Sequence, residues 1–119
     1  MIIIDRREAV AEGLAVKAPC RAATTANITL SGLQTIDGVA LAEGDRVLVK
    51  SQTAGADNGI YTASSGVWQR TRDWDGAYDV VTGTRVLVTA GTTNSWHDFA
   101  IATTGDIVIG TTSISFSTL

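Results

Sequence analysis

The sequence carries the same strand pattern twice, and this repeat limits the folds that the chain can adopt. The first copy, GDRVLVK, spans residues 44–50, and the second, GTRVLVT, spans residues 83–89 and begins 39 residues later. In each copy β-branched valines alternate with other side chains between a glycine and a polar loop, which is the signature of a strand. Two copies are too few for a solenoid, so they predict one β domain built from two related hairpins. We expect the valines of both strands to lie in one core: Val47, Val49, Val86 and Val88.

The length and composition also favour a single all-β domain. The chain has 119 residues, of which 45% are hydrophobic, and it contains 12 glycines and one proline. Turn signals recur about every eight to twelve residues, which predicts a small single-domain β-sandwich or barrel of about nine or ten short strands. We place the β domain at residues 18–119 and an N-terminal arm at residues 1–17.

Local signals define several elements before and between the repeats. Asp37-Gly38 separates two short apolar runs and is the strongest hairpin signal, because a type I′ turn needs two residues that accept positive φ. Lys17 to Ala23 is predicted to be an edge strand, where Pro19 needs no ladder partner. Asn27 to Leu30 and Asp106 to Ile109 are predicted to be further short strands.

The charged and reactive side chains exclude several functions. The net charge is −3 and the nine basic residues are scattered, so no positive patch for nucleic acid is expected. Cys20 is the only cysteine and is predicted to be a small buried apolar residue. His97 is the only histidine and is predicted to be a structural or surface residue, which leaves no catalytic constellation and no cofactor site. We therefore expect a protein that is not an enzyme.

An acidic loop around Trp74 holds the candidate contact residues. Trp68 and Trp96 fall in predicted strands and are expected in the core, whereas Trp74 lies between Asp73 and Asp75 in a polar loop. An exposed aromatic side chain can stack on a sugar or anchor a partner, so Trp74, Asp73 and Asp75 form a possible ligand contact. A loop tryptophan can also fold back over its own domain. The spacing of Asp73, Asp75 and Asp79 is a weak alternative signal for calcium, but it fails the EF-hand pattern.

Four ordered motifs resemble a known family. They are TTANITLSGLQTIDGVALAEGDRVLVKSQT at residues 24–53, NGIY at 58–61, GVWQR at 66–70 and GTRVLVTAGT at 83–92. Together they resemble a module of tailed-bacteriophage virion proteins, usually labelled tail fibre or tail protein, over roughly residues 17–117. The resemblance implies a non-enzymatic β-rich building block that commonly forms homotrimers and contacts other capsid or tail proteins in the virion. We expect a short fibre, tail adaptor or capsid decoration protein; the alternative is a carbohydrate-binding or host-receptor-binding module that contacts a host surface glycan.

The first 17 residues are predicted to be the attachment arm of this module. Asp5 and Glu8 have the spacing of a capping box for one short helix. The short apolar start is neither a signal-peptide core nor a membrane span. We expect the arm to dock onto another virion protein or onto other copies through its apolar residues: Ile2, Ile3, Ile4, Val10 and Leu14. The alternative is that Ile2 to Ile4 add an edge strand to the same subunit.

Overall fold

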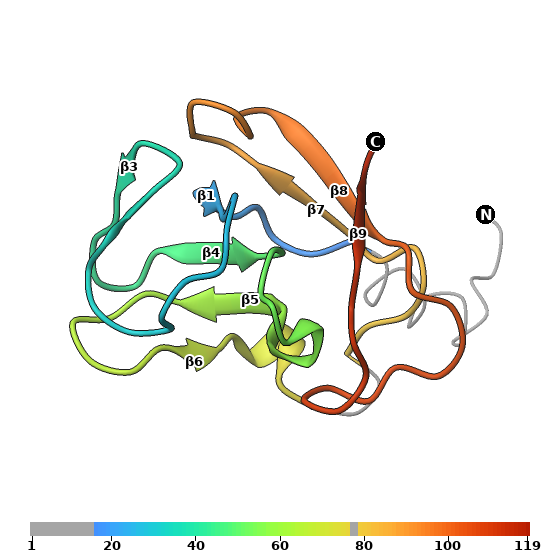
Figure 1. The fold of residues 1–119 in the computed structure, drawn as a ribbon. Helices are drawn as coiled ribbons and strands as arrows, with labels where there is room; N and C mark the ends of the chain where they lie inside the picture. The colour runs from blue at the N-terminus through green and yellow to red at the C-terminus, as the bar shows by residue number, and fades with distance from the viewer. Residues whose placement is uncertain (1–15, 77–78) are drawn as a thin grey trace, which may run out of the picture.

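The structure is a computed structural model, and it describes residues 16–76 and 79–119. These residues form nine short strands and two single-turn 3₁₀ helices, which confirms the all-β class (Figure 1). In chain order they are β1 (Ala22–Ala23), β2 (Thr35–Ile36), β3 (Val39–Ala40), β4 (Arg46–Val49), η1 (Gly55–Asp57), β5 (Gly59–Thr62), β6 (Gln69–Arg70), η2 (Arg72–Trp74), β7 (Arg85–Val88), β8 (His97–Ile101) and β9 (Phe116–Thr118). Residues 1–15 of the predicted arm, including Ile2, Ile3, Ile4, Val10 and Leu14, lie outside the described residues. The last two residues of the predicted arm, Val16 and Lys17, pair with Arg85 of β7 and so belong to the β domain.

Three sheets contain these strands, and one chain segment joins the two larger ones. The sheets have the orders β1-β4-β5-β6, β2-β3 and β7-β8-β9, and all pairs are antiparallel except β1 with β4. Residues 16–24 run beside both β4 and β7. The N–H groups of Lys17 and Cys20 donate to β7 carbonyls at 2.9 Å, and those of Arg21 and Thr24 donate to β4 carbonyls at 2.8 and 2.9 Å. The segment therefore links the two repeat strands.

The predicted edge strand at Lys17 to Ala23 is thus an interior element. It was placed at an edge because Pro19 lacks an N–H group. In the structure the bonding N–H groups of this segment belong to residues 17, 20, 21 and 24. Pro19 occupies a position between these donors, so its missing hydrogen costs no ladder bond, and proline is compatible with an interior position here.

The valines of the two repeats are all buried, but they lie in two cores rather than one. The first core lies between the two larger sheets and contains Cys20, Ala23, Leu48, Ile60, Trp74, Val80, Val86, Val88, Phe99, Ile101 and Ile114. The second core contains Ala22, Ile36, Val39, Leu41, Val47, Val49, Tyr61, Ala63 and Trp68, and the β2–β3 hairpin contributes to it. The prediction of a single core is wrong because successive side chains of β4 point to opposite faces and both faces are covered.

The two repeats nevertheless form the same local structure. Before β4, Asp45 N–H donates to Ala42 O at 3.1 Å, and Ala42 N–H donates to the Asp45 carboxylate at 2.8 Å. Before β7, Thr84 N–H donates to Val81 O at 3.0 Å, and Val81 N–H donates to the Thr84 hydroxyl at 2.9 Å. The predicted equivalence of the GDRVLVK and GTRVLVT segments is confirmed by these matching turns.

The Asp37-Gly38 hairpin is also confirmed. β2 and β3 pair antiparallel across it, and both turn residues have positive φ, 49° for Asp37 and 81° for Gly38. Two other predicted strands are not formed: Asn27 to Leu30 and Asp106 to Ile109 are irregular. Their apolar side chains still pack against the cores at Ile28, Leu30, Ile107 and Ile109, so burial there does not require a ladder.

Substituting Gly38 tests the turn, and Gly32 provides a matched control. Both glycines have φ near 80°, but a Cβ at Gly38 would lie 2.7 Å from Thr92 Oγ1, whereas a Cβ at Gly32 meets nothing within 4 Å. Gly32→Val should cost about 1–2 kcal/mol through backbone strain alone. Gly38→Val should lower the free energy of unfolding further, because it adds the steric contact. Urea unfolding of both variants measures the difference, and equal losses would contradict the close approach to Thr92.

The equivalent leucines of the two repeats test the difference between their environments. Leu48 is fully buried in the first core, whereas Leu87 is only half-buried. Leu48→Ala should cost about 2–5 kcal/mol, the range for cavities in a packed core. Leu87→Ala removes the same atoms from a partly solvated site and should cost clearly less. Thermal and urea unfolding check this order, which a larger loss in the Leu87 variant would overturn.

Candidate functional site

Among the three tryptophans, the exposed one is Trp96, not Trp74. Trp96 is 72% exposed and lies in the loop between β7 and β8 (Figure 1). Its φ is +60°, a left-handed value that is rare for a bulky residue, and its N–H donates to Val88 O at 2.6 Å. The prediction that Trp96 belongs to the core is wrong, because this backbone geometry turns the residue out of the β8 ladder.

Trp74, the predicted ligand contact, is fully buried in the first core. Its ring lies 5.9 Å from that of Phe116, measured between centroids, and η2 turns its side chain inward. A fully buried indole offers no face to a sugar, so its position does not agree with the predicted contact. Trp68 is buried in the second core and donates to Gly32 O at 3.0 Å, which confirms its predicted core position.

The acidic residues around Trp74 serve the fold. Asp73 accepts two hydrogen bonds from the Arg46 guanidinium, at 3.1 and 3.0 Å, and one from Thr71 at 2.6 Å. The Asp79 carboxylate accepts the N–H groups of Asp75 and Gly76, each at 2.9 Å, and so closes a turn. Within residues 16–76 and 79–119 no three His, Cys, Asp or Glu side chains are placed to hold a metal ion. The structure thus uses Asp73 and Asp79 in internal contacts.

The pKa of Asp73 reflects this pairing. Burial by itself would raise the pKa, but the hydrogen bonds from Arg46 and Thr71 and the charges of Arg46 and Lys17 outweigh it and hold the pKa below 3.8. Lys17 is buried and donates from Nζ to Asp79 O at 2.6 Å. Burial lowers its pKa, which the nearby carboxylates of Asp73 and Asp79 partly oppose. Two positive and two negative side chains thus lie together and link the segment before β1 and strand β4 to the loop around η2. They are Lys17, Arg46, Asp73 and Asp79.

The two candidate reactive residues of the sequence occupy structural positions. Burial raises the pKa of the Cys20 thiol to about 12, so Cys20 is a protonated core residue, as predicted. The His97 ring is exposed at the start of β8 and lies 6.3 Å from the Phe99 ring, edge to face. Residues 97 and 99 are two apart in β8, so the two rings lie on the same face of the strand.

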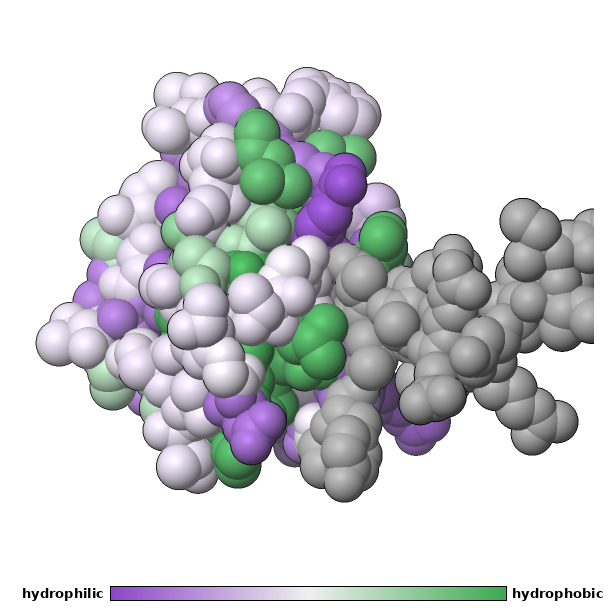
Figure 2. All heavy atoms as spheres, turned by 90° about the vertical axis from the view of Figure 1, so that its right-hand side faces the viewer, coloured by the Kyte–Doolittle hydropathy of each residue, from purple (hydrophilic) through white to green (hydrophobic). Residues whose placement is uncertain are grey.

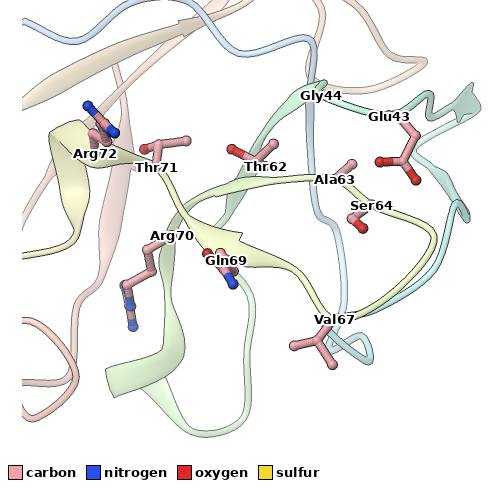
Figure 3. A pocket seen from close by; sticks show the side chains of 10 residues that line it. All are labelled: Glu43, Gly44, Thr62, Ala63, Ser64, Val67, Gln69, Arg70, Thr71 and Arg72. Atoms are coloured by element: carbon pink, nitrogen blue, oxygen red, sulfur yellow. The ribbon is translucent and has the colours of Figure 1, made fainter.

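A shallow hollow of about 420 Å³ lies over the β5–β6 hairpin (Figure 3). It is lined by Glu43, Gly44, Thr62, Ala63, Ser64, Val67, Gln69, Arg70, Thr71 and Arg72. The Arg70 guanidinium is fixed by two hydrogen bonds, because it donates to Asn58 O at 3.0 Å and to Ala56 O at 2.8 Å. Glu43 accepts the Ser65 N–H. These polar side chains support the hairpin and converge on no common point, so the hollow presents no constellation for chemistry.

Exposed apolar side chains occur at several separate places. They are Val16, Leu33, Val67, Val81, Trp96, Val108 and Leu119. On the face drawn in Figure 2, apolar residues form separate groups between polar ones outside the area covered by grey atoms. In the part of the chain that the structure describes, no helix has the length and apolar character needed to cross a bilayer.

No family model matches the sequence, and no curated protein or solved structure matches it.

The Arg46–Asp73 pair predicts a pH-dependent stability. Because the folded pKa of Asp73 lies below its ordinary value of 3.8, the ionised group stabilises the fold above that pH, and this contribution is lost as the pH falls through the folded pKa. Asp73→Asn should cost roughly 1.5–3 kcal/mol at pH 7, the range for hydrogen bonds to charged groups. The difference from the parent should shrink towards pH 2. Urea unfolding across this range measures it; Asp75→Asn, at an exposed carboxylate, is the control and should change little.

Proposed function

We propose that this chain is a structural protein of a tailed-bacteriophage virion that acts by protein–protein assembly. It would serve as a short fibre, tail adaptor or capsid decoration. The observation that carries the proposal is the ordered set of motifs in residues 24–92 that resemble the phage tail-fibre and tail-protein module. The all-β fold is compatible with this role.

The positions of the motif residues support a scaffold role. The Asp37-Gly38 pair of the first motif forms the β2–β3 turn, and the GDRVLVK strand supplies both cores. In NGIY, the buried Asn58 donates to Ile114 O at 2.8 Å and ties two distant segments together. In GVWQR, Trp68 fills the second core. The residues that carry the resemblance therefore stabilise the fold, and this favours a structural building block over a catalyst.

Assembly would use the first 17 residues and the exposed apolar positions. The described chain begins at Val16, which is exposed and pairs with Arg85 at the start of β7. Under the proposal, the preceding arm with Ile2, Ile3, Ile4, Val10 and Leu14 docks onto a capsid or tail protein or onto other copies. Three copies form the assembled unit, in the virion, after folding in the bacterial cytoplasm.

Light scattering and particle analysis test the assembly role. The full-length protein should elute with three times the 12.4 kDa mass of one chain. A variant lacking residues 1–13 should keep its melting temperature but fail to enter particles of the phage that encodes it, as measured by immunoblotting of purified virions. Full-length protein absent from those virions would overturn the proposal. If the shortened variant unfolds, the arm belongs to the domain and its docking role is lost.

A further inference from the structure

Trp96 combines two features that a hairpin normally avoids. It places a large indole at 72% exposure, and it holds a non-glycine residue at φ +60°. Left-handed backbone conformations of non-glycine residues persist only where the surrounding structure imposes them, and such strain clusters at functional positions. The loop of residues 89–96 is therefore a candidate binding site.

The first repeat shows that the hairpin does not require this geometry. Gly59 pairs with Val49, the last valine of β4, and His97 pairs with Val88, the last valine of β7. Asn58 and Trp96 are the residues that precede these partners. Asn58 has φ −66° and is 4% exposed, and the positive φ of this hairpin, 155°, falls on Gly59, so the first hairpin closes without a strained bulky residue. The exposure of Trp96 is a property of the second loop and not of the shared fold.

Contacts from the β2–β3 turn and from β1 hold the Trp96 loop in place. The Asp37 carboxylate accepts the N–H groups of Thr93 and Asn94, at 3.0 and 2.9 Å, and Thr92 N–H donates to Asp37 O at 2.9 Å. Asn94 is buried and donates to Ala23 O at 3.2 Å. Figure 1 shows the β2–β3 turn beside the loop between β7 and β8. A side chain presented by a fixed loop loses little conformational entropy when it binds a ligand.

The chemistry of the loop points to a neutral, hydroxyl-rich ligand. Residues 89–96 read TAGTTNSW and contain no charged side chain, while Thr92 and Thr93 are exposed. A pyranose ring has an apolar face of C–H groups that stacks on an indole, and its hydroxyl groups pair with hydroxyl and amide groups around that indole. A protein partner would need a wider apolar contact, and Trp96 is the one large apolar side chain of the eight.

We propose that the loop of residues 89–96 is a binding site for neutral carbohydrate, with the Trp96 indole as the stacking platform. The inference is independent of the virion assembly role, since it rests on the second loop alone. It also differs from a site at Trp74, whose indole is inside the core.

Tryptophan fluorescence can detect the ligand at this position. Trp68 and Trp74 are buried, so acrylamide quenching of the full-length protein reports mainly on Trp96. Maltotriose, chitotriose and methyl β-galactopyranoside serve as probes, together with a printed array of neutral glycans. At least one neutral glycan should reduce the quenching of Trp96 in a saturable manner.

Two substitutions separate stacking from folding. Trp96→Gly accepts the positive φ and removes the platform, so it should fold and weaken binding by about tenfold or more, which corresponds to about 1.4 kcal/mol. Trp96→Tyr keeps an aromatic face and should retain most of the affinity on the array. Val67→Ala, at a 76% exposed residue on the β5–β6 hairpin, is the matched surface control and should bind like the parent.

Three results would overturn the proposal. The first is that no neutral glycan on the array or among the soluble probes binds the folded protein. The second is binding that Trp96→Gly leaves unchanged while its melting curve matches the parent. The third is protection of Trp96 that rises with protein concentration without added sugar, because that result assigns the loop to contacts between copies. Particle incorporation is measured separately, so failure here leaves the assembly role to its own test.

Discussion

The fold depends on one segment, residues 16–24, that hydrogen-bonds to both repeat strands. β4 and β7 have nearly the same sequence, and each would be left with an open side if this segment were absent. Its donors are divided between them, with Lys17 and Cys20 bonded to β7 and Arg21 and Thr24 bonded to β4. The backbone groups on these sides of the strands are thus paired within the molecule, as buried polar groups must be. Cys20 and Ala22 from the same segment enter the first and second core respectively, so the ladder and the packing reinforce each other.

The surroundings of each repeat decide what its identical residues do. The RVLV strand of the first repeat has both faces covered, so Val47 and Val49 enter the second core while Leu48 enters the first. In the second repeat only the valine face is covered, and Leu87 is half-buried opposite Asp98. The arginine that opens each strand finds a carboxylate in both cases: Arg46 pairs with Asp73 at 3.0 Å, and Arg85 pairs with Asp98 at 2.6 Å. The two repeats therefore have the same strand, the same preceding turn and a similar arginine–carboxylate pair. They differ in which faces of the strand are covered by other side chains.

The sequence predicts the elements whose signals are local and fails where burial depends on distant contacts. The Asp37-Gly38 turn and the two RVLV strands follow from turn chemistry and alternation, which involve a few adjacent residues. For Trp74 the polar neighbourhood left two readings open, a ligand contact or a fold back over its own domain, and the buried position agrees with the second. For Trp96 an apparent strand suggested burial, which is wrong. In the structure η2 turns Trp74 into the core, and the positive φ of Trp96 turns it out. The glycine and asparagine of the TAGTTNSW loop indicate irregular backbone before Trp96. They do not indicate whether the Trp96 side chain points into the core or into solvent.

A division between frame and loop also explains how one chain could both assemble and bind a ligand. Trp96 lies outside the four motifs that resemble the phage module, and the buried residues of those motifs serve the cores and the turns. The N–H groups of the loop that carries Trp96 instead donate to the carboxylate of Asp37, which belongs to the hairpin that contributes to the second core. Gly91 allows this approach, because a Cβ there would meet the Asp37 carboxylate. The β2–β3 hairpin thus holds the exposed loop of the second repeat in place. The exposed residues of the loop can therefore change without disturbing either core, whereas a change in the β2–β3 turn alters the contacts of the loop directly.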